Sequence, residues 1–202
     1  MNIAILTIVA YLFGAIPFGL LIAKSRGIDI RSQGSGNIGA TNVFRVIGKG
    51  WGIFTFALDA LKGFIPAFFF PMIGNLTGDW GMLFGLITIL GHTFPIYLKF
   101  KGGKGVATSA GVLLGIAPLA VGIGFACWLV VVFVSRYVSL ASVIAAMVVG
   151  VVVWIDPKQE SLIIQCSVTL MSILVVWLHR ANIKRLVNGT ENRFGKKKES
   201  AA

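Results

Sequence analysis

The stretch VATSAGVLLGIAPLAVGIGFACWLVVVFVS, residues 106–135, decides how this chain can cross a membrane. As a single helix it would be about 45 Å long, whereas the hydrocarbon core of a bilayer is about 30 Å thick. Pro118 also removes a helix hydrogen bond near the middle of the stretch. The stretch is therefore either one long span or two short spans, 106–118 and 119–135.

The overall composition is that of an integral membrane protein. Hydrophobic residues make up 56% of the 202 residues, charged residues make up only 12%, and the mean hydropathy is +0.89. A soluble domain carries about 25% charged residues. The apolar segments lack the alternation of barrel strands, which predicts helices. They cover residues 3–23, 51–73, 79–98, 106–118, 119–135, 139–155 and 161–179.

The distribution of Lys and Arg chooses between one and two spans in residues 106–135, because short cytoplasmic loops collect basic residues. With two spans the chain crosses seven times, from an outside N-terminus to a cytoplasmic C-terminus, and sixteen of the eighteen Lys and Arg residues are cytoplasmic. One long span would place the basic tail outside. We therefore predict an all-α, seven-helix transmembrane bundle, with a single domain over residues 1–193 and a basic, disordered tail over 194–202.

This topology brings every polar, glycine-rich stretch to the cytoplasmic face. Glycine permits the positive-φ conformations that aim successive backbone N–H groups at one anion, and Lys and Arg supply positive charge. These are the parts of a phosphate-binding active site. Attraction of anionic lipid headgroups is the alternative for any single basic residue, but it requires no glycines. The stretches are residues 31–50, 99–108, 135–142 and 179–192.

Several common cofactor and metal motifs do not fit. GSGNIG at residues 34–39 has dinucleotide-binding spacing but follows a membrane span rather than a strand. GGKG at residues 102–105 lacks the first glycine and the Ser or Thr of a P-loop. Neither histidine starts an H-x-x-x-x-D box, and no cluster of carboxylates offers metal ligands. We expect neither a cofactor nor a metal.

Ionisable residues within or at the end of a span usually face the bundle interior. For Asp59 and Lys62, spaced i, i+3, we favour a structural ion pair or interhelical anchor over a catalytic role. For His92 we favour a helix-packing hydrogen bond over a place in the wall of the site. His179 ends the last span and shares a helical face with Asn182, which places it in the site; a capping role at the interface is the alternative.

Four motifs together resemble the bacterial PlsY family, the acyl-phosphate-dependent glycerol-3-phosphate acyltransferases. The motifs are GSGNIGATNVFR, FKGGKGVAT, RYVSLAS and HRANIKRLVNGTE, in the family's order over nearly the whole chain. The resemblance implies transfer of a fatty acyl group from acyl phosphate to the 1-hydroxyl of sn-glycerol 3-phosphate. The products would be 1-acyl-sn-glycerol 3-phosphate (lysophosphatidic acid) and inorganic phosphate, in the first step of phospholipid biosynthesis. It also implies a place in the bacterial cytoplasmic (inner) membrane.

The resemblance assigns roles to residues of each motif. Acyl phosphate is expected to be bound by Ser35, Gly36, Asn37, Gly39, Ala40, Thr41 and Asn42. Glycerol 3-phosphate is expected to be bound by Arg45, Gly103, Lys104, Gly105, Ser142, His179 and Asn182. The expected catalytic residues are His179, Lys104, Ser35 and Arg45. Glu191 either completes the polar wall or pairs with a neighbouring basic residue.

Three side chains are plausible bases for activating the attacking hydroxyl, namely His179, His92 and Glu191. The phosphate of glycerol 3-phosphate itself, whose second pKa is about 6, is the alternative. No Ser or Cys has a nucleophile–base arrangement, so we expect direct transfer without an acyl-enzyme. A transporter or flippase of an organic phosphate is the alternative function, although it would show paired halves with polar sites near the midplane. The expected partners are the two substrates and membrane lipids, without nucleic acid, and the expected state is a monomer.

Overall fold

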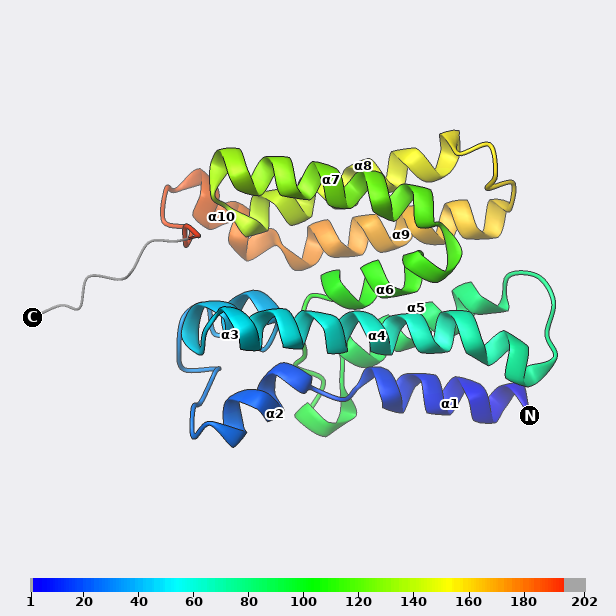
Figure 1. The fold of residues 1–202 in the computed structure, drawn as a ribbon, viewed down its shortest axis with the longest axis horizontal. Helices are drawn as coiled ribbons and strands as arrows, with labels where there is room; N and C mark the ends of the chain where they lie inside the picture. The colour runs from blue at the N-terminus through cyan, green and yellow to red at the C-terminus, as the bar shows by residue number, and fades with distance from the viewer. Residues whose placement is uncertain (1, 195–202) are drawn as a thin grey trace, which may run out of the picture.

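The computed structural model describes residues 2–194, and within that range every regular element is a helix (Figure 1). The prediction of an all-α protein is confirmed for these residues. The elements are α1 (Ile3–Gly14), α2 (Phe18–Ser25), α3 (Ala40–Val46), α4 (Lys49–Gly74), α5 (Trp80–Thr93), η1 (Ile96–Leu98), α6 (Val106–Ile116), α7 (Pro118–Ser135), α8 (Val138–Ile155), α9 (Leu162–Leu178) and α10 (Arg180–Val187).

The long helices form two layers with α6 between them (Figure 1). One layer contains α1, α4 and α5, and the other contains α7, α8 and α9, while α6 packs on α4 and α5 and also reaches α7. α4 and α6 pack closely because each helix contributes a glycine that faces the backbone of the other helix. A Cβ atom on Gly63 would collide with the backbone of Thr108, and one on Gly111 would collide with the backbone of Ala60. Small residues permit this kind of approach between membrane helices.

A shared apolar core joins the two layers near one end of the molecule. It draws buried side chains from α4, α5, α6, α7, α8 and α9, including Ala67, Met82, Val112, Ala120 and Val153. Because lipid tails are as apolar as these side chains, helices in a membrane are held together by close packing rather than by a hydrophobic driving force. The apolar core therefore holds the two layers together at this end. At the other end, polar side chains lie between the layers.

Residues 106–135 form two helices rather than one. The chain breaks at Ala117 and restarts at Pro118, where the missing N–H of proline suits the first position of α7. α6 and α7 run in opposite directions along the molecule (Figure 1). α6 has 11 residues, which corresponds to about 16 Å of helix and is shorter than the hydrocarbon core of about 30 Å.

Four helices are long and apolar enough to cross a membrane, and up to six spans result if each of two bent pairs counts as one; this holds for the described residues. The pair α1 and α2 is bent by 41°, and the pair α9 and α10 by 52°. The first bend lies at Ile16 and Pro17, because proline removes a helix hydrogen bond and disfavours helical geometry in the residue before it. These findings make the chain a multi-pass membrane protein.

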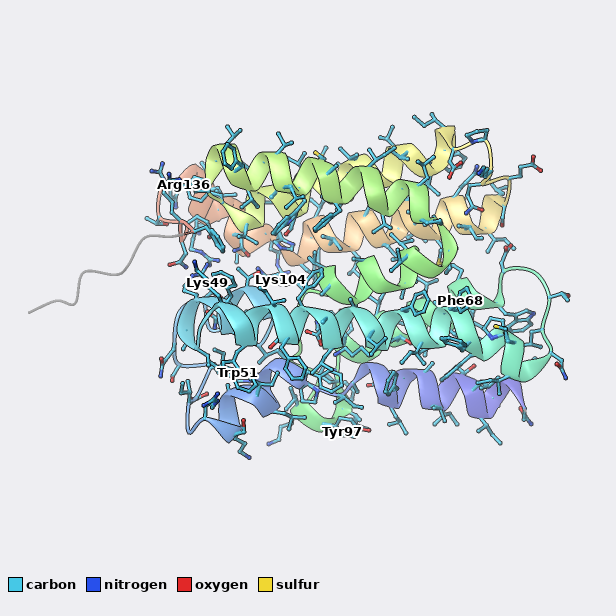
Figure 2. All side chains as sticks on the ribbon, in the orientation of Figure 1. Lys49, Trp51, Phe68, Tyr97, Lys104 and Arg136 are labelled. Carbon is cyan, nitrogen blue, oxygen red and sulfur yellow. The ribbon has the colours of Figure 1, made fainter. Side chains whose placement is uncertain are left out.

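The two ends of the molecule differ in their side chains. Figure 2 shows Lys49 and Arg136 at the end where α3 and α10 lie, Lys104 further inward between the two layers, and Phe68 toward the opposite end. The sequence-predicted polar stretches therefore meet in one half of the molecule. Phe194 still packs here, with its ring 4.9 Å from that of Phe44 and its N–H donating to Arg136 O at 2.7 Å. The remainder of the predicted tail, residues 195–202, lies outside the described residues.

Candidate active site

A cavity of about 600 Å³ lies between the two layers, running from the polar half of the molecule to the shared apolar core. Its apolar wall comes from α4, α6, α7, α8 and α9, with Phe56, Leu114, Phe125, Val149 and Met171 among its residues. Its polar wall includes Ser35, Asn37, Thr41, Asn42, Arg45, Lys104, Ser139, Ser142, His179, Asn182 and Glu191, together with Asp59, His92, Ser109 and Ser172. One chamber thus joins a basic, hydroxyl-rich part to an apolar part.

The structure brings the sequence-predicted site residues together. All of them except Gly36 and Gly103 line the cavity. Those two glycines sit next to lining residues, Gly36 between Ser35 and Asn37, and Gly103 directly before Lys104. Residues from four separate motifs therefore share one wall, although the first and last motifs stand more than a hundred positions apart in the sequence.

Asn42 organises the first glycine loop, residues 34–39, and is 1% exposed. Its amide nitrogen donates to the carbonyl oxygens of Ile30, Gln33 and Asn37 at 3.1, 3.0 and 2.9 Å. Its Oδ1 accepts the N–H of Ser35 at 2.9 Å. Buried backbone groups require such partners, so the hydrogen bonds of Asn42 fix the conformation of the loop around Ser35.

Two glycines of this loop occupy the left-handed region, Gly34 at φ +61° and Gly36 at φ +71°. A Cβ atom on Gly34 would also collide with Oδ1 of Asn42. At the end of the loop, Asn37 Oδ1 accepts the Gly39 N–H at 2.7 Å, and α3 begins at Ala40. Arg45, one turn into α3, turns its guanidinium toward Asn42, with Nη1 3.5 Å from Oδ1.

The second glycine loop, residues 101–105, lies against the end of α5. Gly102 N–H donates to Thr93 O and Gly103 N–H donates to His92 O, both at 3.1 Å. Gly105 has φ +75° and precedes the first residue of α6. Because the first N–H groups of a helix have no intrahelical acceptor, the start of α6 offers free donors next to Lys104, where Gly105, Val106 and Ala107 line the cavity.

Glu191 ties the last helices to the cavity wall, and 5% of its side chain is exposed. Its Oε1 accepts from Asn182 Nδ2 at 2.7 Å and from Ser139 Oγ at 2.9 Å, while its Oε2 pairs with Arg185 Nε at 2.7 Å. Asn182 in turn accepts a hydrogen bond from Lys104 Nζ through Oδ1. Of the two roles considered for Glu191, the structure shows the pairing with a basic neighbour, together with a place in the wall.

The polar part of the cavity is electrically positive. Burial lowers the pKa of Lys104 to about 8; the Glu191 carboxylate opposes this shift, and the charges of Arg185 and Arg45 add to it. Burial alone would raise the pKa of Glu191, but its hydrogen bonds from Asn182, Arg185 and Ser139 bring that pKa below its ordinary value. A bound anion would relieve the repulsion among the cations, so the site is arranged to take up negative charge.

His179 lies between α9 and α10 and is 4% exposed. Its Nδ1 is 2.8 Å from Val175 O. Because a carbonyl only accepts, we assign the hydrogen to Nδ1, which leaves Nε2 as an acceptor. Burial, together with the Lys104 charge, lowers the pKa of His179 to about 4. The imidazole is therefore neutral near pH 7 and offers an acceptor to a hydroxyl group.

One residue that sequence reasoning missed is Trp128 of α7, which lines the cavity. Its Nε1–H donates to Ser142 Oγ at 3.2 Å, and the Ser142 hydroxyl donates to Val138 O at 2.9 Å. Trp128 thus fixes the hydroxyl of a predicted site residue. No sequence signal distinguishes it, because a Trp in an apolar span is also typical of a lipid-facing aromatic residue.

Three ionisable residues from the predicted spans 51–73 and 79–98 lie together inside the bundle, and we define Asp59, Lys62 and His92 as the interior cluster. Lys62 Nζ is 2.8 Å from Asp59 Oδ1, and it donates to Ile16 O at 2.7 Å, at the bend between α1 and α2. The predicted ion pair and interhelical anchor are both present. For His92, the alternative that we disfavoured is what the structure shows, since His92 lines the cavity. Within residues 2–194, no three His, Cys, Asp or Glu side chains gather in a group that could hold a metal ion.

Comparisons with known proteins agree across nearly the whole chain. The family described as glycerol-3-phosphate acyltransferase matches residues 4–189. A glycerol-3-phosphate acyltransferase of Geobacter sulfurreducens is 46% identical over 195 residues, which cover 96% of this chain and 98% of the relative. One of Aquifex aeolicus is 42% identical over 195 residues, covering 96% of this chain and 100% of the relative.

Two crystal structures of PlsY, an integral membrane glycerol 3-phosphate acyltransferase, have the same fold. The glycerol 3-phosphate form superposes with a TM-score of 0.90 and the lysophosphatidic acid form with a TM-score of 0.87. Both are 40% identical to this chain, and each match covers 96% of both chains.

Proposed function

Because the chain belongs to the glycerol-3-phosphate acyltransferase family and has that activity, we propose that its acyl donor is an acyl phosphate. The reaction is transfer of the acyl group to the 1-hydroxyl of sn-glycerol 3-phosphate, giving 1-acyl-sn-glycerol 3-phosphate and inorganic phosphate. The observation that carries this proposal is the single cavity in which a basic chamber continues into an apolar one. An acyl phosphate needs both.

Two separate sets of anion-binding groups support two phosphate positions. The first glycine loop forms one set, and Arg45 with Lys104 and the start of α6 forms the other. Backbone N–H groups and fixed cations stabilise charge as it develops in acyl transfer. We assign the first set to the acyl phosphate and the second to glycerol 3-phosphate, with Ser142, His179 and Asn182 completing the second position.

The transfer proceeds in one step. The 1-hydroxyl oxygen bonds to the carbonyl carbon, the bond from that carbon to the phosphate oxygen breaks, and inorganic phosphate leaves. The hydroxyl proton goes to the phosphate of glycerol 3-phosphate, whose second pKa of about 6 suits a base working near pH 7. His179, with a pKa of about 4, is a weaker base, and its Nε2 orients the hydroxyl by accepting a hydrogen bond.

The proposed setting is the bacterial cytoplasmic membrane, with seven crossings, the N-terminus outside, and the C-terminus and active site cytoplasmic. The concentration of Lys and Arg at the end that contains α3 and α10 supports this orientation. In this arrangement α6, the fourth crossing in chain order, is the short helix that brings the number of crossings to seven. We propose a monomer, with one domain over residues 1–193.

The decisive experiment measures phosphate release from palmitoyl phosphate by the purified protein in detergent, with and without glycerol 3-phosphate, and with palmitoyl-CoA as the control donor. Release that requires glycerol 3-phosphate and does not occur with palmitoyl-CoA supports the proposal. Equal or better transfer from palmitoyl-CoA would overturn the choice of donor. A covalent acyl-enzyme trapped by acid quenching would overturn direct transfer.

The pH profile of the same assay tests the proton acceptor. If the substrate phosphate takes the proton, the acid limb of kcat lies near pH 6 and stays there in His179→Gln. An acid limb near pH 4, the pKa of His179, that disappears in His179→Gln would instead identify His179 as the base.

A further inference from the structure

The interior cluster lies directly beneath the second glycine loop. Gly102 and Gly103 are bonded to the carbonyl oxygens of Thr93 and His92, so the two residues before Lys104 follow the last turn of α5. Neither glycine is among the positive-φ residues. Glycine is required at both positions because there is no room for a side chain. A Cβ atom on Gly103 would collide with Nε2 of His92, and one on Gly102 would collide with His92 O.

The imidazole of His92 is held from its other side. Its Nδ1 is 3.8 Å from Asp59 Oδ1, a distance at which attraction is electrostatic rather than a hydrogen bond. Asp59 is fixed by Lys62, and Lys62 is fixed by Ile16 O. Helices α4 and α5 and the bend between α1 and α2 therefore converge on the side chain that supports Gly103.

The cluster is buried and yet belongs to the cavity. Asp59, Lys62 and His92 are 3%, 1% and 7% exposed, and Asp59 and His92 line the same chamber as Lys104. Ionisable groups inside a membrane are costly and are kept for a function or for fixed geometry. The Asp59 charge already has its partner in Lys62, which leaves His92 to contact the loop.

We infer that His92, supported by Asp59 and Lys62, is a positioning residue that sets where Lys104 Nζ lies in the cavity and thereby determines affinity for glycerol 3-phosphate. The inference rests on the proposed role of Lys104 at the glycerol 3-phosphate position. His92 acts through the backbone of Gly103 and does not touch the reacting atoms. Its loss displaces the ammonium group and leaves the acyl phosphate position, built on Asn42, intact.

The test is a double-mutant cycle of His92→Ala and Lys104→Ala, with the KM for glycerol 3-phosphate and the KM for palmitoyl phosphate measured separately. His92→Ala is expected to raise the KM for glycerol 3-phosphate by about tenfold in the parent and by less than about twofold in Lys104→Ala, because coupled residues are not additive. The KM for palmitoyl phosphate is expected to stay within about twofold of the parent. His92→Gln, which keeps a polar planar group, is expected to restore most of the affinity.

Thr88→Ala is the matched control. Thr88 is fully buried one turn earlier on α5, and its hydroxyl bonds only to Phe84 O at 2.8 Å. This variant loses a hydrogen bond in the same helix but is expected to keep the parent KM. An equal rise in KM in Thr88→Ala, or an equal effect of His92→Ala with and without Lys104, would overturn the inference.

A size exchange gives a second test that does not depend on His92→Ala alone. Gly103→Ala introduces a collision with the imidazole, which His92→Ala should relieve in the double variant. Gly102→Ala collides with backbone oxygen atoms of His92 and Thr93, which no change of the His92 side chain can relieve. Recovery of glycerol 3-phosphate affinity in the first pair and not in the second supports the inference, and recovery in neither overturns it.

Failure of the proposed function would look different. If Lys104→Ala leaves the KM for glycerol 3-phosphate unchanged, Lys104 does not hold this substrate, and both its proposed role and the inference about His92 fall, whereas the choice of donor is decided separately by the palmitoyl-CoA control. If Lys104→Ala raises this KM while His92→Ala does not, the proposed function stands and only the positioning role of His92 falls.

Discussion

The two glycine loops have similar compositions but are shaped by different forces. In the first loop, glycine supplies conformation: Gly34 and Gly36 have positive φ angles, and one buried amide, Asn42, bonds to the surrounding backbone. In the second loop, Gly102 and Gly103 supply space, because the chain passes against the end of α5. A glycine-rich motif therefore does not by itself indicate flexibility, because each glycine is required by a different constraint and responds to substitution accordingly.

The largest effect is expected from removing the Asn42 side chain, which holds the first loop in its conformation. Asn42→Ala removes the partner of four backbone groups, and leaving buried polar groups unpaired costs about 1 kcal/mol or more each. We expect kcat/KM for both substrates to fall by about 1,000-fold. Phosphate release from palmitoyl phosphate measures it, with thermal unfolding as the control for folding. A loss confined to glycerol 3-phosphate would contradict the role of Asn42 in the first loop.

Two substitutions in the first loop distinguish the cost of a left-handed backbone conformation from the cost of a steric collision with Asn42. Gly34→Ala adds a left-handed non-glycine residue, at about 1–2 kcal/mol, and also a collision with Asn42, so we expect a loss of about 100-fold. Gly36→Ala carries the same backbone cost, with Arg31 O as its nearest neighbour at 3.1 Å, and is expected to lose about tenfold. Equal losses, measured as kcat/KM for palmitoyl phosphate, would mean that Asn42 does not set the loop.

The second loop is tested through the charge that it presents. With a pKa of about 8, Lys104 is charged below that pH and loses its proton as the pH rises through it. The kcat/KM for glycerol 3-phosphate is therefore expected to decline above pH 8, with roughly a tenth of the free enzyme still charged at pH 9.

Lys104→Arg stays charged throughout this range, so its alkaline limb is expected to disappear even if its activity at pH 7 is lower. Parallel pH profiles of the parent and Lys104→Arg measure this difference. An unmoved alkaline limb would assign the limb to another group.

The smallest effect is expected at the end of the second loop. Gly105 has positive φ like Gly34, but a Cβ atom there would meet only ordinary contacts, with Ile89 Cγ2 at 3.4 Å and Thr93 Oγ1 at 3.5 Å. Gly105→Ala is expected to raise the KM for glycerol 3-phosphate by less than about tenfold. A larger loss than that of Gly34→Ala would reverse the comparison between the loops.

Sequence patterns anticipated much of the site because its chemistry is local. Lys104, Asn182 and His179 stand in polar stretches that interrupt apolar segments, and such interruptions are visible in any hydropathy reading. The pair Asp59 and Lys62 was also predictable, since residues at i, i+3 share a helix face. In contrast, the contact of Trp128 with Ser142 joins two helices through an indole that resembles its lipid-facing neighbours, and nothing in the pattern selects it.

The chain by itself determined that it is an all-α membrane protein, where its helices break, and which residue types gather at one end. Hydropathy, proline content and charge are properties of short segments, so their effects do not depend on which other segments pack against them. Only the tertiary structure decided what holds each loop in place, because packing depends on which segments meet. It placed Asn42 within its loop, His92 under Gly103, and Glu191 between Asn182 and Arg185. These contacts join residues whose spacing in the sequence carries no signal.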